Sequence, residues 1–133
     1  MSDIKSLSHV GIASADGMQM ADFFSKFLGG EILSRDEYPE QDQISTMVRI
    51  GACELEIMEP LGSQGVVTKF LDKKGPGLHH ISIQVTGIAV LAEQLEASGI
   101  QVIGKNFSDP SAHYMFISPK STGGVLIEVF ERF

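Results

Sequence analysis

The sequence predicts an α+β fold in which two βαβββ modules pair and form a curved mixed sheet around a cleft. One observation is a repeat: LSHVGI at 7–12 resembles LHHISI at 78–83, and LEIME at 55–59 resembles IEVFE at 127–131. The other is the order of periodicities, since each half begins with strand-like alternation, continues with helical spacing and ends with strand-like segments. Because a βαβββ unit leaves one face of its sheet uncovered, two units must pair to enclose that face.

The first module spans about residues 5–62. Residues 7–13 alternate as a half-buried strand, and Asp16 can cap a helix that Gly29 ends. The apolar side chains of this helix follow helical spacing at Met20, Phe23, Phe24, Phe27 and Leu28. Three strands are expected after it, at about 30–37, 43–50 and 52–59.

A linker helix of about 63–77 follows, which Ser63 begins and the glycine- and proline-containing segment 73–77 breaks. The second module, about 78–133, repeats the order of the first within what we predict to be a single domain, 1–133. Its helix at 87–98 has Ile88, Leu91, Ala92 and Leu95 on one face, and Gly99 ends it. Its strands are expected near 78–85, 100–105, 113–118 and 124–131.

Charge and cysteine content exclude several classes of protein. A net charge of −7 over 133 residues argues against nucleic acid or an anionic membrane as the main partner. Cys53 is the only cysteine, so no intramolecular disulfide forms, and its apolar strand context predicts a small buried side chain. The N-terminus lacks the apolar core of a secretory signal and no apolar run has the length of a membrane span, so we expect a cytoplasmic protein.

Strand alternation places four polar residues on the same kind of face. The apolar residues Val10, Ile12, Leu55 and Ile57, with their counterparts in the second module, can pack under the helices. The opposite parity carries His9, Glu56, His80 and Glu128, which we therefore expect on the faces turned away from the helices. Two imidazoles and two carboxylates suit Co²⁺, Ni²⁺, Zn²⁺, Mn²⁺ or Fe²⁺, with positions open for water or substrate. The cleft is thus predicted to hold a divalent metal ion.

The two other histidines fit less specific roles. His79 precedes His80 and points to the opposite face, so we expect packing or hydrogen bonding rather than metal binding. His113 falls in a loop or at a strand start, where a surface role is the simpler interpretation and substrate contact the alternative.

The residues resemble those of a known family. Four stretches carry this resemblance: LSHVGIA at 7–13, LEIMEPLG at 55–62, TKFLDKKGPGLHHISIQV at 68–85 and ISPKSTGGVLIEV at 117–129. They are similar to segments of the vicinal oxygen chelate proteins, the glyoxalase I-like superfamily. Within that superfamily the chain looks closest to the methylmalonyl-CoA epimerases.

The resemblance implies a metal-dependent isomerase that moves the C2 proton of an acyl-CoA thioester through a metal-stabilised enolate. His9, Glu56, His80 and Glu128 would be the metal ligands, and Glu128 would also be the acid/base. A second acid/base glutamate is often found on the strand after a Pro-Glu-Gln turn, but here the turn at 39–41 leads to Ser45. Ser45 could relay a proton through water, or Glu128 and another group could share the task.

Three other functions remain open. A glyoxalase I-type lactoylglutathione lyase, acting on a thiol adduct, uses the same ligand set and needs no glutamate at position 45. An Fe²⁺ oxygenase of this fold normally uses one carboxylate, so the second glutamate argues against it. A non-catalytic small-molecule binder tends to lack the full ligand set, so the complete set argues against that function.

Because small modular sheets tend to hide their remaining edges, we also expect a homodimer.

Overall fold

The computed structural model describes residues 1–133. Its eight strands are hydrogen-bonded in the order β2-β3-β4-β1-β5-β8-β7-β6, with parallel and antiparallel neighbours, which confirms the predicted α+β fold. The chain forms two compact units, one of His9–His79 and one of Met1–Ser8 together with His80–Phe133. Strands β1 (Asp3–Ala13) and β5 (Gly77–Thr86) contribute residues to both units.

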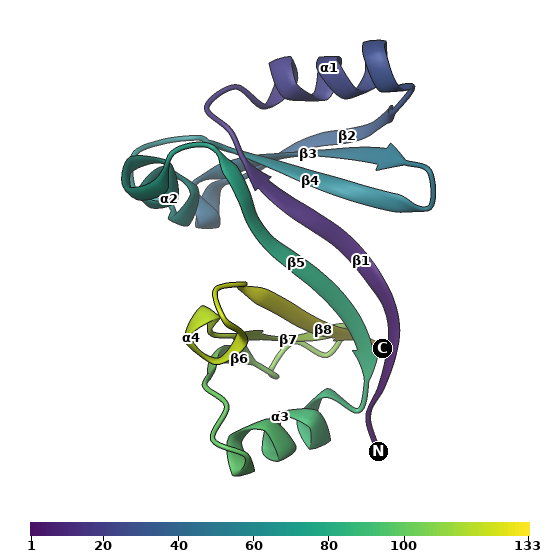
Figure 1. The fold of residues 1–133 in the computed structure, drawn as a ribbon, viewed down its shortest axis with the longest axis vertical. Coiled ribbons are helices and arrows are strands. Elements are labelled where there is room, and N and C mark those ends of the chain that lie inside the picture. Colours follow the sequence, from purple (N-terminus) through teal and green to yellow (C-terminus); the bar gives the residue numbers. More distant parts are fainter. The chain divides into compact units, whose positions relative to one another are not determined.

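In the unit His9–His79, helix α1 (Gly17–Leu28) lies along strands β2 (Glu31–Tyr38), β3 (Gln43–Ile50) and β4 (Cys53–Pro60) (Figure 1). The Asp16 carboxylate accepts a hydrogen bond from the backbone N–H of Gln19, and Gly29 ends the helix in the left-handed conformation, as predicted. A 3₁₀ turn at Pro39–Gln41 joins β2 to β3. The core under α1 contains Ala21, Val48 and Ile57, all fully buried.

Helix α2 (Val66–Lys74) begins later than the expected Ser63. Ser63 lies in a bend, and next to it the Asp42 carboxylate accepts a hydrogen bond from the backbone N–H of Gln64. Val67 of α2 packs on Ala13 and Met58, and Met58 has the same strand parity as Glu56. The expectation that the Glu56 face is turned away from all helices is therefore wrong at this end, where α2 covers it.

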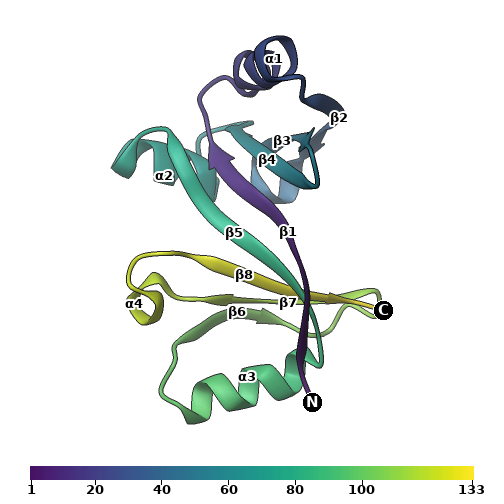
Figure 2. The same cartoon turned by 45° about the vertical axis from the view of Figure 1, so that its right-hand side comes forward.

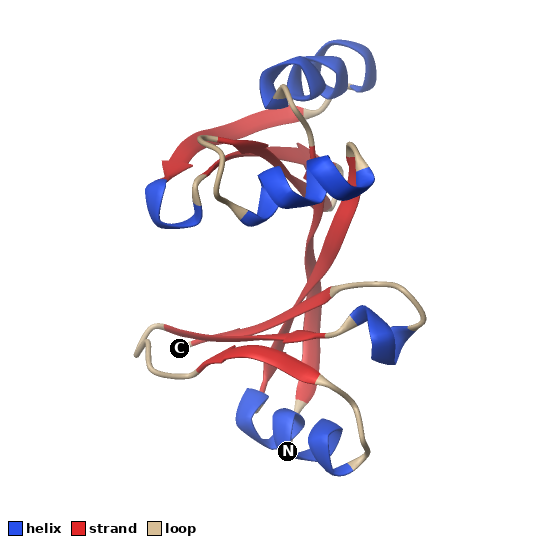
Figure 3. Ribbon diagram, turned by 90° about the vertical axis from the view of Figure 1, so that its left-hand side faces the viewer, coloured by secondary structure: helices blue, strands red, loops and turns tan.

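The unit that contains His80–Phe133 repeats the pattern with helix α3 (Ile88–Ala97) and strands β6 (Val102–Asn106), β7 (Ala112–Ile117) and β8 (Ile127–Arg132). Helix α3 lies along one side of these strands (Figures 2 and 3). The core between them contains Val85, Ile88, Ala92, Met115 and Val129. A short helix, α4 (Pro119–Thr122), was not expected; the Ser118 hydroxyl caps it and proline occupies its first position.

A second pair of repeated glutamates anchors the two long helices of the units. In β8, the Glu131 carboxylate accepts hydrogen bonds from the backbone N–H groups of Gly87 and Ile88, at 2.9 and 3.0 Å. In β4, the Glu59 carboxylate accepts one from Gly17 at 3.2 Å and one from Arg35 at 2.5 Å, which raises the pKa of Arg35. Each carboxylate thus satisfies backbone donors at the positive end of a helix.

Replacing Glu131 by glutamine should lower the free energy of unfolding by about 1–2 kcal/mol, because the amide can accept only one of the two hydrogen bonds and carries no charge. Urea unfolding measures this loss. Glu93→Gln, at an exposed position of α3, is the matched control and should change stability by less than about 0.5 kcal/mol. Equal stability of the two variants would contradict the anchoring role.

Cys53 does not fill the core. Its side chain is exposed, because it opens β4 directly after the turn at Gly51, at an end of the β3–β4 hairpin where the neighbouring residues are also exposed. The expectation of a buried cysteine is therefore wrong. No helix of the structure is long and apolar enough to cross a membrane.

Candidate metal centre

His9 and Glu56 meet within one unit because of the register between β1 and β4. The parallel pairing sets Gly11 opposite Glu56, and His9 lies two residues before Gly11 on the same face of the sheet. The Nε2 atom of His9 is 3.4 Å from Oε1 of Glu56, and the two side chains are 16% and 20% exposed. Both groups can therefore be reached from solvent while most of their surface is packed.

The other carboxylate oxygen of Glu56 is held from β3. The Ser45 hydroxyl donates a hydrogen bond to Oε2 of Glu56 at 3.0 Å, and Nε2 of Gln43 donates to Ser45 Oγ at 3.0 Å. Gln43 and Ser45 are both buried. Ser45 was singled out from the sequence, whereas Gln43 was missed. Its signal was its position, since 43 and 45 share one strand face and are both polar.

The second unit repeats this arrangement with a different neighbour. The parallel pairing of β5 with β8 sets Ser82 opposite Glu128, and His80 lies two residues before Ser82. The Ser82 hydroxyl donates a hydrogen bond to Oε1 of Glu128 at 2.6 Å. Ser82 is fully buried and His80 is nearly so. Ser82 was missed because its counterpart in the first module, Gly11, has no side chain.

Three of the four predicted ligands come together. His9, Glu56 and His80 each offer a ligand atom within 4.8 Å of the other two. Nitrogen and oxygen ligands bind transition metals at about 2.0–2.2 Å, so ligand atoms on one ion lie about 3–4 Å apart. The His/Glu/His set is compatible with a divalent ion. Glu128 is not part of this group of three.

The remaining histidines lie in aromatic contacts. His79 meets Phe70 edge-on, with 4.8 Å between ring centroids, which confirms its packing role. Burial lowers the pKa of His79, while the negative charge of Glu56 acts in the opposite direction. His113 lies in β7, where it stacks on Phe107 at 5.1 Å and meets the edge of Phe133 at 4.7 Å. It is thus a packing residue rather than a freely exposed one.

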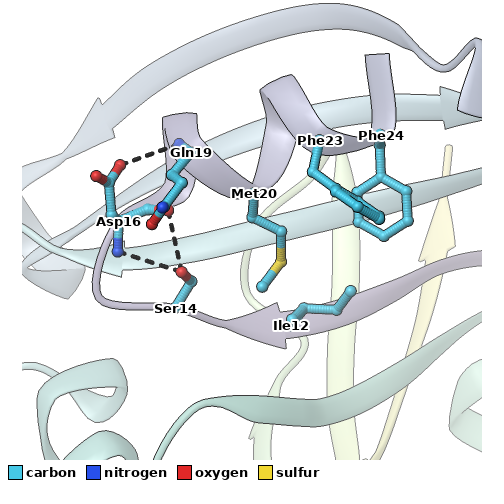
Figure 4. A pocket seen from close by; sticks show the side chains of 7 residues that line it. All are labelled: Ile12, Ser14, Asp16, Gln19, Met20, Phe23 and Phe24. Carbon is cyan, nitrogen blue, oxygen red and sulfur yellow. Dashed lines mark hydrogen bonds between the residues drawn. The ribbon is translucent and has the colours of Figure 1, made fainter. Parts of the chain in front are cut away.

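A separate hollow lies beside α1 (Figure 4). Its apolar wall is formed by Ile12, Met20, Phe23 and Phe24, and its polar end by Ser14, Asp16 and Gln19. The polar groups are engaged with each other: Ser14 and Asp16 exchange hydrogen bonds, and Asp16 caps the helix. Ile12 has the opposite parity to His9 and Gly11, so this hollow is on the other face of β1 from His9.

Comparison with known proteins decides the family. The model of the Glyoxalase/Bleomycin resistance protein/Dioxygenase superfamily matches residues 8–117. The chain belongs to this superfamily. The predicted resemblance to the glyoxalase I-like proteins is thereby confirmed.

Within the superfamily, the chain is similar to proteins named as epimerases. It is 32% identical to the mitochondrial methylmalonyl-CoA epimerase of Mus musculus over 127 residues, which cover 92% of this chain and 71% of that protein. It is 34% identical to the uncharacterized protein YqjC of Bacillus subtilis over 128 residues, with coverage of 94% and 91%. A variant of Streptomyces coelicolor methylmalonyl-CoA epimerase in complex with 2-nitronate-propionyl-CoA has a TM-score of 0.84 and 26% identity, covering 98% of this chain and 96% of that one.

Proposed function

We propose that this superfamily member is a metal-dependent epimerase acting on a 2-substituted malonyl-CoA or a similar acyl-CoA thioester. The observation that carries the proposal is the group formed by His9, Glu56 and His80, in a chain related to methylmalonyl-CoA epimerases along nearly its whole length. Such a donor set, with positions left open, suits the abstraction of a proton next to a carbonyl.

The residues that would hold the ion are His9, Glu56 and His80, which form the candidate group, with Glu128 as the proposed fourth ligand and Co²⁺, Ni²⁺, Zn²⁺ or Mn²⁺ as the fitting metals. When bound, the ion supplies Lewis acidity that polarises the thioester carbonyl and so acidifies the neighbouring C2–H. The protein's part is to place a base at that hydrogen and to hold the acyl group still while the proton moves.

Glu128 is the proposed acid/base. The Ser82 hydroxyl engages its Oε1, so the carboxylate is held in one orientation, as proton transfer at a defined carbon requires. The proton leaves C2 for Glu128, and the opposite face of the resulting enolate must receive a proton from another group. Ser45 can serve there only as a relay through water, because an aliphatic hydroxyl is too weakly acidic to act as an unaided base.

A glyoxalase I-type lyase is the second candidate function. It is favoured by one specific observation: Ser45, at the place where epimerases often have a glutamate, is a hydrogen-bond donor to Glu56. Glu56 and Glu128 would then be the two available carboxylate bases, and the substrate would be a thiohemiacetal. The second carboxylate continues to argue against an Fe²⁺ oxygenase.

Exchange of the C2 hydrogen distinguishes these functions. With Co²⁺ or Ni²⁺ added, the protein should replace C2–H of methylmalonyl-CoA by deuterium from the solvent, as followed by proton NMR. Metal binding without exchange would contradict the epimerase assignment. Turnover of the hemithioacetal of methylglyoxal and glutathione by the same preparation would establish the lyase instead.

A further inference from the structure

Each candidate carboxylate ligand has one oxygen engaged by a buried serine. Ser45 donates to Oε2 of Glu56 at 3.0 Å, and Ser82 donates to Oε1 of Glu128 at 2.6 Å. The two serines are 3% and 0% exposed. Because burying a carboxylate without partners costs free energy, a hydroxyl at each of these oxygens stabilises the glutamates where they stand.

The two contacts are not copies of one another in the repeat. Ser45 lies on β3, the antiparallel neighbour of the Glu56 strand, whereas Ser82 lies on β5, the parallel neighbour of the Glu128 strand. The equivalent of Ser82 in the first module is Gly11, and the equivalent of Ser45 in the second is Tyr114. The same chemical contact is thus reached from opposite sides, so duplication of one ancestral serine does not account for the pair.

The direction of the Ser45 hydrogen bond follows from its neighbours. Gln43 donates its amide N–H to Ser45 Oγ, which leaves the serine proton for the Glu56 carboxylate. The reverse orientation of the Gln43 amide would set two acceptors against a single hydroxyl proton. Only the orientation with the nitrogen toward Ser45 satisfies all three groups.

The two oxygens of Glu56 have separate partners, since Oε1 faces Nε2 of His9 and Oε2 faces Ser45. We propose that Ser45 and Ser82 are positioning residues that make Glu56 and Glu128 bind metal through one oxygen each. This inference rests on the proposed metal site. Two histidines and two one-oxygen carboxylates supply four ligand atoms, which leaves two positions of a six-coordinate ion for substrate oxygens. Two-oxygen binding by both carboxylates would supply six ligand atoms and leave no position.

Titration of the metal-free protein with Co²⁺ tests the role without any substrate. Ser82→Ala and Ser45→Ala should each weaken Co²⁺ binding by about 10–100-fold, the usual effect of losing a group that orients a ligand. Their visible Co²⁺ absorption should also change, because a released carboxylate can bind through both oxygens and displace a water ligand. Ser45→Thr and Ser82→Thr, which keep the hydroxyl, should restore affinity and absorption. Ser6→Ala, an exposed serine of β1, is the control and should behave as the unmodified chain.

Wild-type Co²⁺ affinity and absorption in both alanine variants would overturn the inference. A lower heat stability of their metal-free forms would not rescue it, because a purely structural hydrogen bond would also contribute stability. If Ser82→Ala does not fold, Ser45→Ala and the milder Gln43→Ala decide in its place. Gln43→Ala keeps the Ser45 hydroxyl but removes the donor that fixes its orientation, so we expect a smaller loss of affinity than in Ser45→Ala. Failure of the unmodified chain to bind Co²⁺ would overturn the metal site itself, whereas binding without C2–H exchange would affect only the proposed substrate.

Discussion

Glu128→Gln should slow the deuterium exchange of C2–H by about 10²–10⁴-fold, the usual contribution of a positioned general acid/base. The glutamine has nearly the same shape, but its single carbonyl oxygen replaces two carboxylate oxygens, so it can meet either the Ser82 hydroxyl or the metal ion and Co²⁺ affinity should also fall. It cannot accept the C2 proton. The loss should therefore appear in kcat when exchange is measured at saturating Co²⁺.

The matched control is Glu131→Gln, the same substitution three residues further along β8 and on the other face of the strand. Because Glu131 anchors α3, this variant should lose stability while it retains exchange at 25 °C. A Glu128→Gln protein that binds Co²⁺ and exchanges C2–H at nearly the wild-type rate would show that another group moves the proton.

Strand parity and helix spacing were sufficient to predict the architecture. The apolar positions of 7–13 and 78–85 alternate, and Asp16 and Gly29 bracket α1 as capping rules require. The same parity placed His9 with Glu56 and His80 with Glu128 on shared faces, which the register of the parallel strands bears out. These features are local, so a single sequence contains them.

The misses depend on partners that lie far along the chain. Ser82 reads as an ordinary strand serine until β8 brings Glu128 beside it, 46 residues away in sequence. Gln43 acquires a role only through Ser45 and Glu56. The segment just before α2 is held by the carboxylate of Asp42, which accepts a hydrogen bond from the backbone N–H of Gln64, 22 residues later in the sequence. The exposure of Cys53 depends on which part of the sheet lacks a helix, which no local pattern specifies.

Removal of one histidine should have a large effect on metal binding. His80 is the most buried of the three grouped ligands, and its removal takes one of two imidazoles from the candidate group. Changes to groups that merely orient a ligand already cost about 10–100-fold in affinity, so His80→Ala should weaken Co²⁺ binding by more than about a hundredfold. His113→Ala, which removes a histidine packed between Phe107 and Phe133, is the control and should leave the affinity unchanged.

The number of metal ions bound per chain tests the central claim most directly. If both His/Glu pairs of the repeat serve one ion, isothermal titration of the metal-free protein with Co²⁺ should end at one ion per chain, and in His80→Ala that binding should be weaker by more than about a hundredfold. Two ions per chain would mean that His9–Glu56 and His80–Glu128 act as separate sites. No binding, or a His80→Ala protein that binds as tightly as the unmodified chain, would contradict the shared metal centre.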